Sequence, residues 1–144
     1  MLVALGGPRT DVVELFSPDR FSSKSAKHWL SPGMAFDLRH GWDLAKEDVR
    51  RECWRLLEAS SWVVIGSPPC TSFSILQQMN PDRGTEEFNK TMKQAIEHVD
   101  FCCAVFQWQC DQGRFFLFEQ PASASSWKLK PVRDLMQRKG VIKV

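Results

Sequence analysis

The chain has 144 residues, of which 43% are hydrophobic and 25% charged, and its formal net charge is +2. These values predict one globular domain over residues 10–144, behind a short leader over residues 1–9. No apolar run is long enough to cross a bilayer and the leader lacks the basic start of a signal peptide, so we expect no membrane partner and an intracellular protein, nuclear or cytoplasmic. The five cysteines form no CxxC pair and no zinc-binding spacing, which excludes a disulfide framework and leads us to expect no metal.

The predicted elements alternate between strands and helices along the chain. Short apolar runs predict strands, and apolar residues spaced three and four apart predict helices. In chain order we expect a strand over 10–16, a helix over 17–30 capped by Ser17, a strand over 33–38 and a helix over 45–59 capped by Asp43. There follow a strand over 62–66, an irregular segment over 71–84, a helix over 86–110, a strand over 114–118, a helix over 131–139 and a strand from 141.

This alternation predicts an α/β fold with a mostly parallel sheet and helices on both faces. The last predicted strand has barely begun at Val144, so the sheet is expected to be incomplete. We therefore expect a fragment of a longer polypeptide that carries further domains.

The segment around Cys70 is the most informative stretch of the sequence. An apolar run over residues 63–65 ends at a glycine, Pro68 and Pro69 follow, and Cys70 then begins a loop of small polar residues. Two successive prolines fix the backbone and remove two hydrogen-bond donors, so the chain before Cys70 neither continues as a paired strand nor coils into a helix. This arrangement predicts a thiol at the carboxyl end of a buried strand, where open α/β sheets bind ligands.

Acidic residues lie at the ends of the other predicted strands: Glu14, Asp37 and Glu119. Right-handed crossovers place all carboxyl ends along one rim of a parallel sheet, so these acids and Cys70 are expected to converge on one crevice. Glu119 follows an apolar strand, and such a setting is expected to raise its pKa. Structural roles stay open as well: a packing thiol for Cys70, an acceptor of loop amides for Glu119, and turn or cap residues for Asp37 and Asp43.

At these positions the chain resembles the DNA (cytosine-5) methyltransferases. Residues 66–74, Gly-Ser-Pro-Pro-Cys-Thr-Ser-Phe-Ser, look like that family's Pro-Cys loop, and residues 118–121, Phe-Glu-Gln-Pro, are similar to its F-E-N motif. Residues 11–17, Asp-Val-Val-Glu-Leu-Phe-Ser, are similar to its first cofactor strand. The resemblance covers about residues 10–144 and implies a Rossmann-like S-adenosylmethionine-dependent methyltransferase core.

The resemblance also implies a reaction and a set of site residues. The Cys70 thiolate would add to carbon 6 of a flipped-out cytosine in duplex DNA, and Glu119 would protonate ring nitrogen 3, so that carbon 5 attacks the methyl group. S-adenosylmethionine would supply that methyl group. The resemblance places Asp37 at the ribose hydroxyls and Asp43 at the adenine amine, and it assigns the remaining contacts with the cofactor to Glu14, Phe16, Ser17 and Pro68.

The sequence departs from the family pattern at several points. The closely spaced glycines after the first strand are replaced by residues 17–21, Ser-Pro-Asp-Arg-Phe, and the later Q-x-R-x-R block is absent. An inactive domain therefore stays open, as does a non-catalytic nucleic-acid-binding or interaction module of a mobile-element polyprotein, using the basic tail from Lys128 onward and exposed tryptophans such as Trp127. An amino-methyltransferase acting on an exocyclic nitrogen is a further alternative, although Cys70 stands where such enzymes carry an aromatic residue. A thiol hydrolase would need a histidine beside Cys70.

Overall fold

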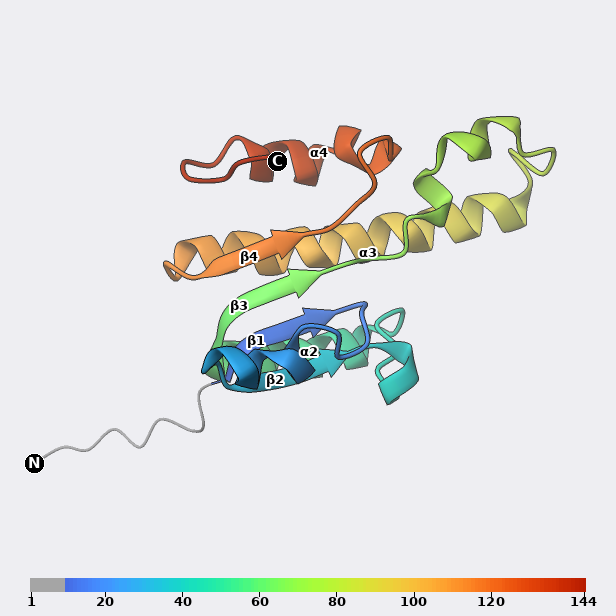
Figure 1. Ribbon diagram of the computed structural model, residues 1–144. Helices are drawn as coiled ribbons and strands as arrows, with labels where there is room; N and C mark the ends of the chain where they lie inside the picture. Colours follow the sequence, from blue (N-terminus) through green and yellow to red (C-terminus); the bar gives the residue numbers. More distant parts are fainter. Residues whose placement is uncertain (1–9) are drawn as a thin grey trace, which may run out of the picture.

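The computed structural model describes residues 10–144, so the predicted leader over residues 1–9 lies outside the described part of the chain. Its centre is a four-stranded sheet in which all neighbouring strands run parallel, in the order β2-β1-β3-β4 (Figure 1). The strands are β1 (Thr10–Leu15), β2 (Pro32–Phe36), β3 (Ser61–Gly66) and β4 (Phe115–Phe118). The predicted α/β fold with a parallel sheet is confirmed.

Within residues 10–144, helices lie in the connections between these strands and after the last strand. The α-helices are α1 (Ser22–Ser25), α2 (Glu47–Ser60), α3 (Glu86–Asp111) and α4 (Lys130–Met136). Short 3₁₀ helices span Ala26–His28, Leu38–His40, Thr71–Phe73, Ile75–Met79 and Ser125–Lys128. The long helix α3 begins where it was predicted, because the Thr85 side chain accepts a hydrogen bond of 3.2 Å from the Phe88 amide.

One face of the sheet carries the hydrophobic core. Alternate residues of a strand point to opposite faces, and on this face the strands pack against α2 and α3. The core combines buried residues of these elements: Val13, Leu15, Phe36, Val64, Cys53, Leu57, Val99, Cys102 and Phe106. The apolar side of the helix predicted over 86–110 therefore faces the sheet.

The other face of the sheet is covered only in part. Helix α1 and the loop before it pack over β1 and β2, where Val12 and Glu14 are buried. At β4, in contrast, Phe115 is 56% and Leu117 51% exposed. The prediction of helices on both faces is right at β1 and β2 and wrong at β4, because α4 packs against α3 instead.

Several predicted element boundaries are corrected by the structure. The helix predicted over 17–30 shrinks to α1 and the 3₁₀ turn after it, and Ser17 caps neither. Val141–Val144 form no strand, because they lie across a groove from β4 and do not pair with it. The segment predicted as irregular over 71–84 contains two short 3₁₀ helices.

The strand order reverses between β1 and β3. The chain passes from β1 to β2 on one side of the sheet and then to β3 and β4 on the other. In the doubly wound dinucleotide-binding fold, with strand order 3-2-1-4-5-6, four neighbouring strands show the same reversal. The arrangement is therefore compatible with a Rossmann-like fold, whose ligands bind beside the reversal at the carboxyl ends of the strands.

Candidate functional site

The segments that follow the four strands are joined side by side at one edge of the sheet. The Phe16 amide donates to the Phe36 carbonyl at 2.9 Å, the Ser67 amide to the Leu15 carbonyl at 3.0 Å, and the Glu119 amide to the Gly66 carbonyl at 2.9 Å. These bonds continue the sheet ladder one residue beyond the strands. The expected convergence of the strand ends on a single rim is thus present in the structure.

The Pro-Pro-Cys loop is held in place from both sides. Pro68 is buried, and its carbonyl accepts a hydrogen bond of 2.7 Å from the Gln120 side chain, which comes from the end of β4. Cys70 is half-buried and directly precedes the 3₁₀ turn that ends at the buried Phe73. Gly66 is required before the loop, because a Cβ there would lie 2.6 Å from Cζ of Phe106. The Cys70 thiol is therefore carried on an anchored loop.

Glu119 is tied to the same loop by its side chain. Its carboxylate accepts a hydrogen bond of 2.9 Å from the Ser67 hydroxyl, and Ser67 lies three residues before Cys70. The neighbouring Gln120 accepts a hydrogen bond of 3.0 Å from Ser126, so the loop, the end of β4 and the segment after it form one network. The expectation of an apolar setting for Glu119 is wrong: the residue is exposed, because β4, which it follows, is the edge strand of the sheet and is itself not buried.

The remaining cysteines differ from Cys70 in their surroundings. Burial raises the pKa values of Cys53 and Cys102 well above the ordinary range and that of Cys103 to about 12. These thiols stay protonated at neutral pH and act as small apolar side chains of the core. Cys110 is half-buried at the far end of α3, so Cys70 is the accessible thiol that lies at the rim.

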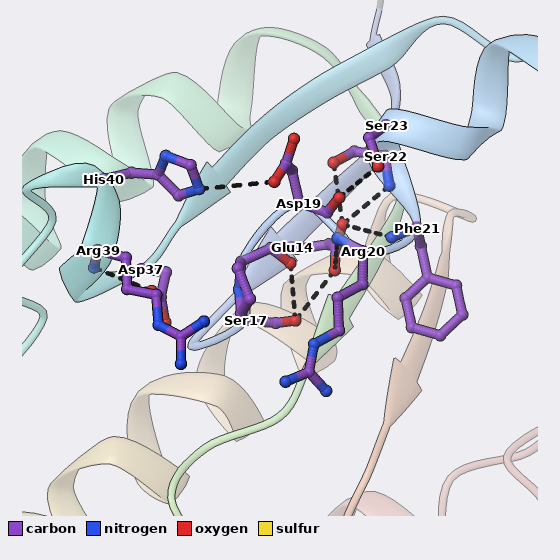
Figure 2. Close-up of polar contacts among 11 residues, drawn as sticks. Glu14, Ser17, Asp19, Arg20, Phe21, Ser22, Ser23, Asp37, Arg39 and His40 are labelled. Atoms are coloured by element: carbon purple, nitrogen blue, oxygen red, sulfur yellow. Dashed lines mark hydrogen bonds and ion pairs between the residues drawn. The ribbon is translucent and has the colours of Figure 1, made fainter.

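Glu14 organises the loop that follows β1 (Figure 2). Its fully buried carboxylate accepts hydrogen bonds from the amides of Arg20, Phe21 and Ser22, at 3.3, 2.9 and 2.8 Å, and from the hydroxyls of Ser17 and Ser22, at 3.1 and 2.9 Å. Because this carboxylate takes the amides at the start of α1, Ser17 has no capping role. Glu14 and Ser17 lie at the rim as predicted, but both side chains form hydrogen bonds within the loop.

Phe16 adopts an unusual backbone conformation directly after β1. Its φ angle is 57°, in the left-handed region that non-glycine residues rarely adopt, and its ring lies 4.7 Å from the imidazole of His98, centroid to centroid. The Nε2 atom of His98 is buried and has no hydrogen-bond partner within residues 10–144. Strained backbone of this kind is concentrated at functional sites.

We expect His98 to make the stability of the fold depend on pH. Burial lowers the pKa of His98, the positive charge of Arg50 lowers it further, and Glu97 and Asp43 oppose this shift. The unfolded chain therefore binds a proton more readily, so the free energy of unfolding should fall as the pH drops below about 6.5. Urea denaturation between about pH 7.5 and 5.5 should show this slope, and His98→Phe should flatten it whereas His28→Phe should not. An unchanged slope in His98→Phe would contradict this assignment.

The two aspartates predicted to bind the cofactor lie beyond β2. Asp37 caps the 3₁₀ turn after β2 and accepts a hydrogen bond of 2.9 Å from the Arg39 amide (Figure 2). Asp43 accepts one of 3.2 Å from the Ala45 amide and pairs with Lys46 at 3.6 Å, although α2 itself begins only at Glu47. Both residues thus have the turn or cap roles that the sequence left open. In each carboxylate one oxygen accepts the hydrogen bond from the backbone amide and the other does not take part in that bond.

Leu38 is a candidate that the sequence analysis did not identify. It directly follows Asp37 and is 71% exposed at the end of β2. Its side chain therefore offers an apolar surface beside the Asp37 carboxylate. The signal in the sequence was an apolar residue at the first position after the acid, but its exposure became apparent only once the 3₁₀ turn was known.

Among residues 10–144 no group of three or more histidine, cysteine or acidic residues is arranged to hold a metal ion. Over the same range no helix combines the length and apolar character that a membrane span requires. No protein-family model, curated protein or solved structure matches the chain.

Proposed function

We propose that this chain is the catalytic core of an S-adenosylmethionine-dependent methyltransferase that acts on carbon 5 of cytosine in DNA. The observation that carries the proposal is the joining of the Pro-Pro-Cys loop to the end of β4. Two side-chain hydrogen bonds, Ser67 to Glu119 and Gln120 to Pro68, hold that loop beside the carboxylate. A thiol and an acid on neighbouring strand ends suit a reaction that needs both on one planar base.

The proposed chemistry begins with the thiolate of Cys70. It adds to carbon 6 of the cytosine, and Glu119 donates a proton to nitrogen 3, so that no negative charge builds up on the ring. Carbon 5 then becomes nucleophilic and accepts the methyl group. The carbon-5 proton is then lost to water, the thiolate departs, and nitrogen 3 returns its proton to Glu119, which restores the ring and the carboxyl group. The base has to leave the duplex to reach the rim, and once bound it would exclude water from the exposed Glu119 carboxyl.

S-adenosylmethionine supplies an electrophilic methyl group, and the residues at the ends of β1 and β2 suit its adenosine part. The Asp37 carboxylate has one oxygen beyond its bond to the Arg39 amide, and a ribose hydroxyl can donate to it. The exposed Leu38 provides an apolar surface for a flat ring. The amides after β1 do not fit the methionine carboxylate, because Glu14 already occupies them. We therefore place only the adenosine part at this edge.

A covalent trap tests the proposal. A DNA duplex containing 5-fluorocytosine should form a stable adduct with the protein when S-adenosylmethionine is present, because the fluorine cannot leave as the carbon-5 proton does. Mass spectrometry of the digested complex should locate the adduct on the peptide that contains Cys70. The matched variant Cys110→Ser should still form it. No adduct, or an adduct on Cys110, would contradict the proposal, and methylation of an exocyclic nitrogen without an adduct would favour the amino-methyltransferase.

A non-catalytic interaction module is the second candidate function. The internal use of the loop amides by Glu14 favours it, because these amides are then closed to a ligand carboxylate. The prediction that Trp127 is exposed is wrong. Its side chain is half-buried, because the indole ring packs on Phe118 and its N–H donates a hydrogen bond to the Pro121 carbonyl. Trp29 and Trp62 are the exposed tryptophans instead. Calorimetry separates the two functions, since a module should give no heat with millimolar S-adenosylmethionine.

A further inference from the structure

The outer edge of β4 is open in the structure. β4 is the last strand of the sheet, and within residues 10–144 no strand pairs with its outer side. The Glu119 amide donates a hydrogen bond to the Gly66 carbonyl of β3. The backbone N–H and C=O groups of successive strand residues point alternately to the two sides of the strand. Those of Phe116 and Phe118 therefore point away from β3. An open edge of this kind is a template for another strand.

A groove runs along this edge. It has a volume of about 540 Å³ and lies between β4 on one side and α4 with the segment after it on the other. Its walls are largely apolar and include the exposed side chains of Phe115, Leu117 and Ile142. The groove therefore offers both unpaired backbone groups and apolar surface to an extended segment.

The charged side chains along the groove have one sign. Arg114, Lys139 and Lys143 line it, and no acidic residue does so. Arg114 lies over Trp108 at 5.0 Å and Lys143 over Trp127 at 4.1 Å, which holds two of these cations in place. A second copy of β4 would bring another Arg114 and its neighbouring lysines to the same groove, and like charges oppose that pairing.

We propose that the groove binds an extended acidic peptide of a partner protein, which adds to β4 as a fifth strand. In such binding, main-chain hydrogen bonds give affinity and alternate side chains give specificity. The backbone groups of Phe116 and Phe118 bond the peptide, its apolar side chains contact Phe115 and Leu117, and its carboxylates face Lys139 and Lys143. This interaction is independent of the chemistry proposed for Cys70.

A labelled heptapeptide of sequence DVTVEVD tests this inference. Fluorescence anisotropy should show binding that weakens at high salt, and the peptide KVTVKVK should not bind. Lys139→Glu should weaken binding by about two- to fivefold, whereas the matched reversal Lys93→Glu, on an exposed part of α3, should not. Hydrogen exchange of the Phe116 and Phe118 amides should slow when the peptide binds. Circular dichroism of both variants checks that they fold.

Several results would overturn the inference. Equal affinity for the two peptides would show that charge does not select the ligand. Unchanged hydrogen exchange of the Phe116 and Phe118 amides would show that the peptide does not add to β4 as a strand. Failure of DVTVEVD to bind at millimolar concentration would exclude this class of ligand. Sedimentation that shows dimers, with slow exchange of the same two amides in the absence of peptide, would assign the groove to a second copy of the chain.

Discussion

Cys70→Ser is expected to lower methyl transfer by at least about a thousandfold while the protein stays folded. A serine hydroxyl is nearly isosteric with the thiol but is far less nucleophilic, so carbon 6 of cytosine is not attacked. Cys70 is half-buried and does not belong to the hydrophobic core cluster, so the smaller oxygen should cost little stability. Transfer of a radiolabelled methyl group from S-adenosylmethionine to duplex DNA measures the effect, with thermal denaturation as the check on folding.

The matched variants sharpen this result. Cys110→Ser removes a half-buried thiol at the far end of α3 and should leave transfer unchanged. Glu119→Gln keeps an oxygen that accepts the hydrogen bond from the Ser67 hydroxyl. The amide cannot protonate nitrogen 3, so methyl transfer should fall by a factor of about 10²–10³. Methyl transfer that survives in Cys70→Ser would show that no covalent adduct is needed.

Glu14→Ala is expected to lower the free energy of unfolding by about 3–5 kcal/mol. The change removes the acceptor of three backbone amides and two hydroxyls and leaves a cavity between β1 and α1. Buried donors without an acceptor each cost about 1–3 kcal/mol, and only part of this is recovered if the loop opens to water. Urea denaturation followed by circular dichroism gives the measurement.

Two further variants separate this effect from a simple loss of charge. Glu14→Gln fills the same volume but presents an amide group to donors, so it should cost about 1–3 kcal/mol, less than the alanine change. Glu47→Ala removes an exposed carboxylate that pairs with Arg51, and it should cost less than about 1 kcal/mol. A Glu14→Ala protein as stable as Glu47→Ala would contradict the organising role of Glu14.

Elements with a strong local pattern were predicted well from the sequence. The helix α3 matches its predicted range within one residue at its end, because its apolar stripe and the Thr85 cap are both local features. β3 and its end at Gly66 were also predicted, since β-branched residues and proline restrict the backbone without help from distant parts of the chain. The shared rim of the strand ends followed from the alternation of strands and helices, which predicts parallel strands joined by right-handed crossovers.

Elements that depend on distant partners were predicted less well. Ser17, followed by Pro18, has the pattern of a helix start, but a buried carboxylate on β1 takes the amides that such a helix would begin with. Val141–Val144 have the composition of a strand, but a strand forms only when another strand pairs with it. The exposed position of Glu119 likewise depends on the place of β4 at the edge of the sheet, which its own neighbours in sequence do not reveal.

The sequence by itself thus determined the class of fold and which chemical groups stand at the strand ends, because hydrophobic periodicity and proline act over a few residues. Only the tertiary structure decided how those groups are used. It turns Glu14 inward to organise a loop, ties Glu119 and Gln120 to the Pro-Pro-Cys loop, and leaves one edge of β4 open. The physical reason is that a hydrogen-bonding group takes whichever partner the packed chain brings within about 3 Å, and that partner is set by the whole fold.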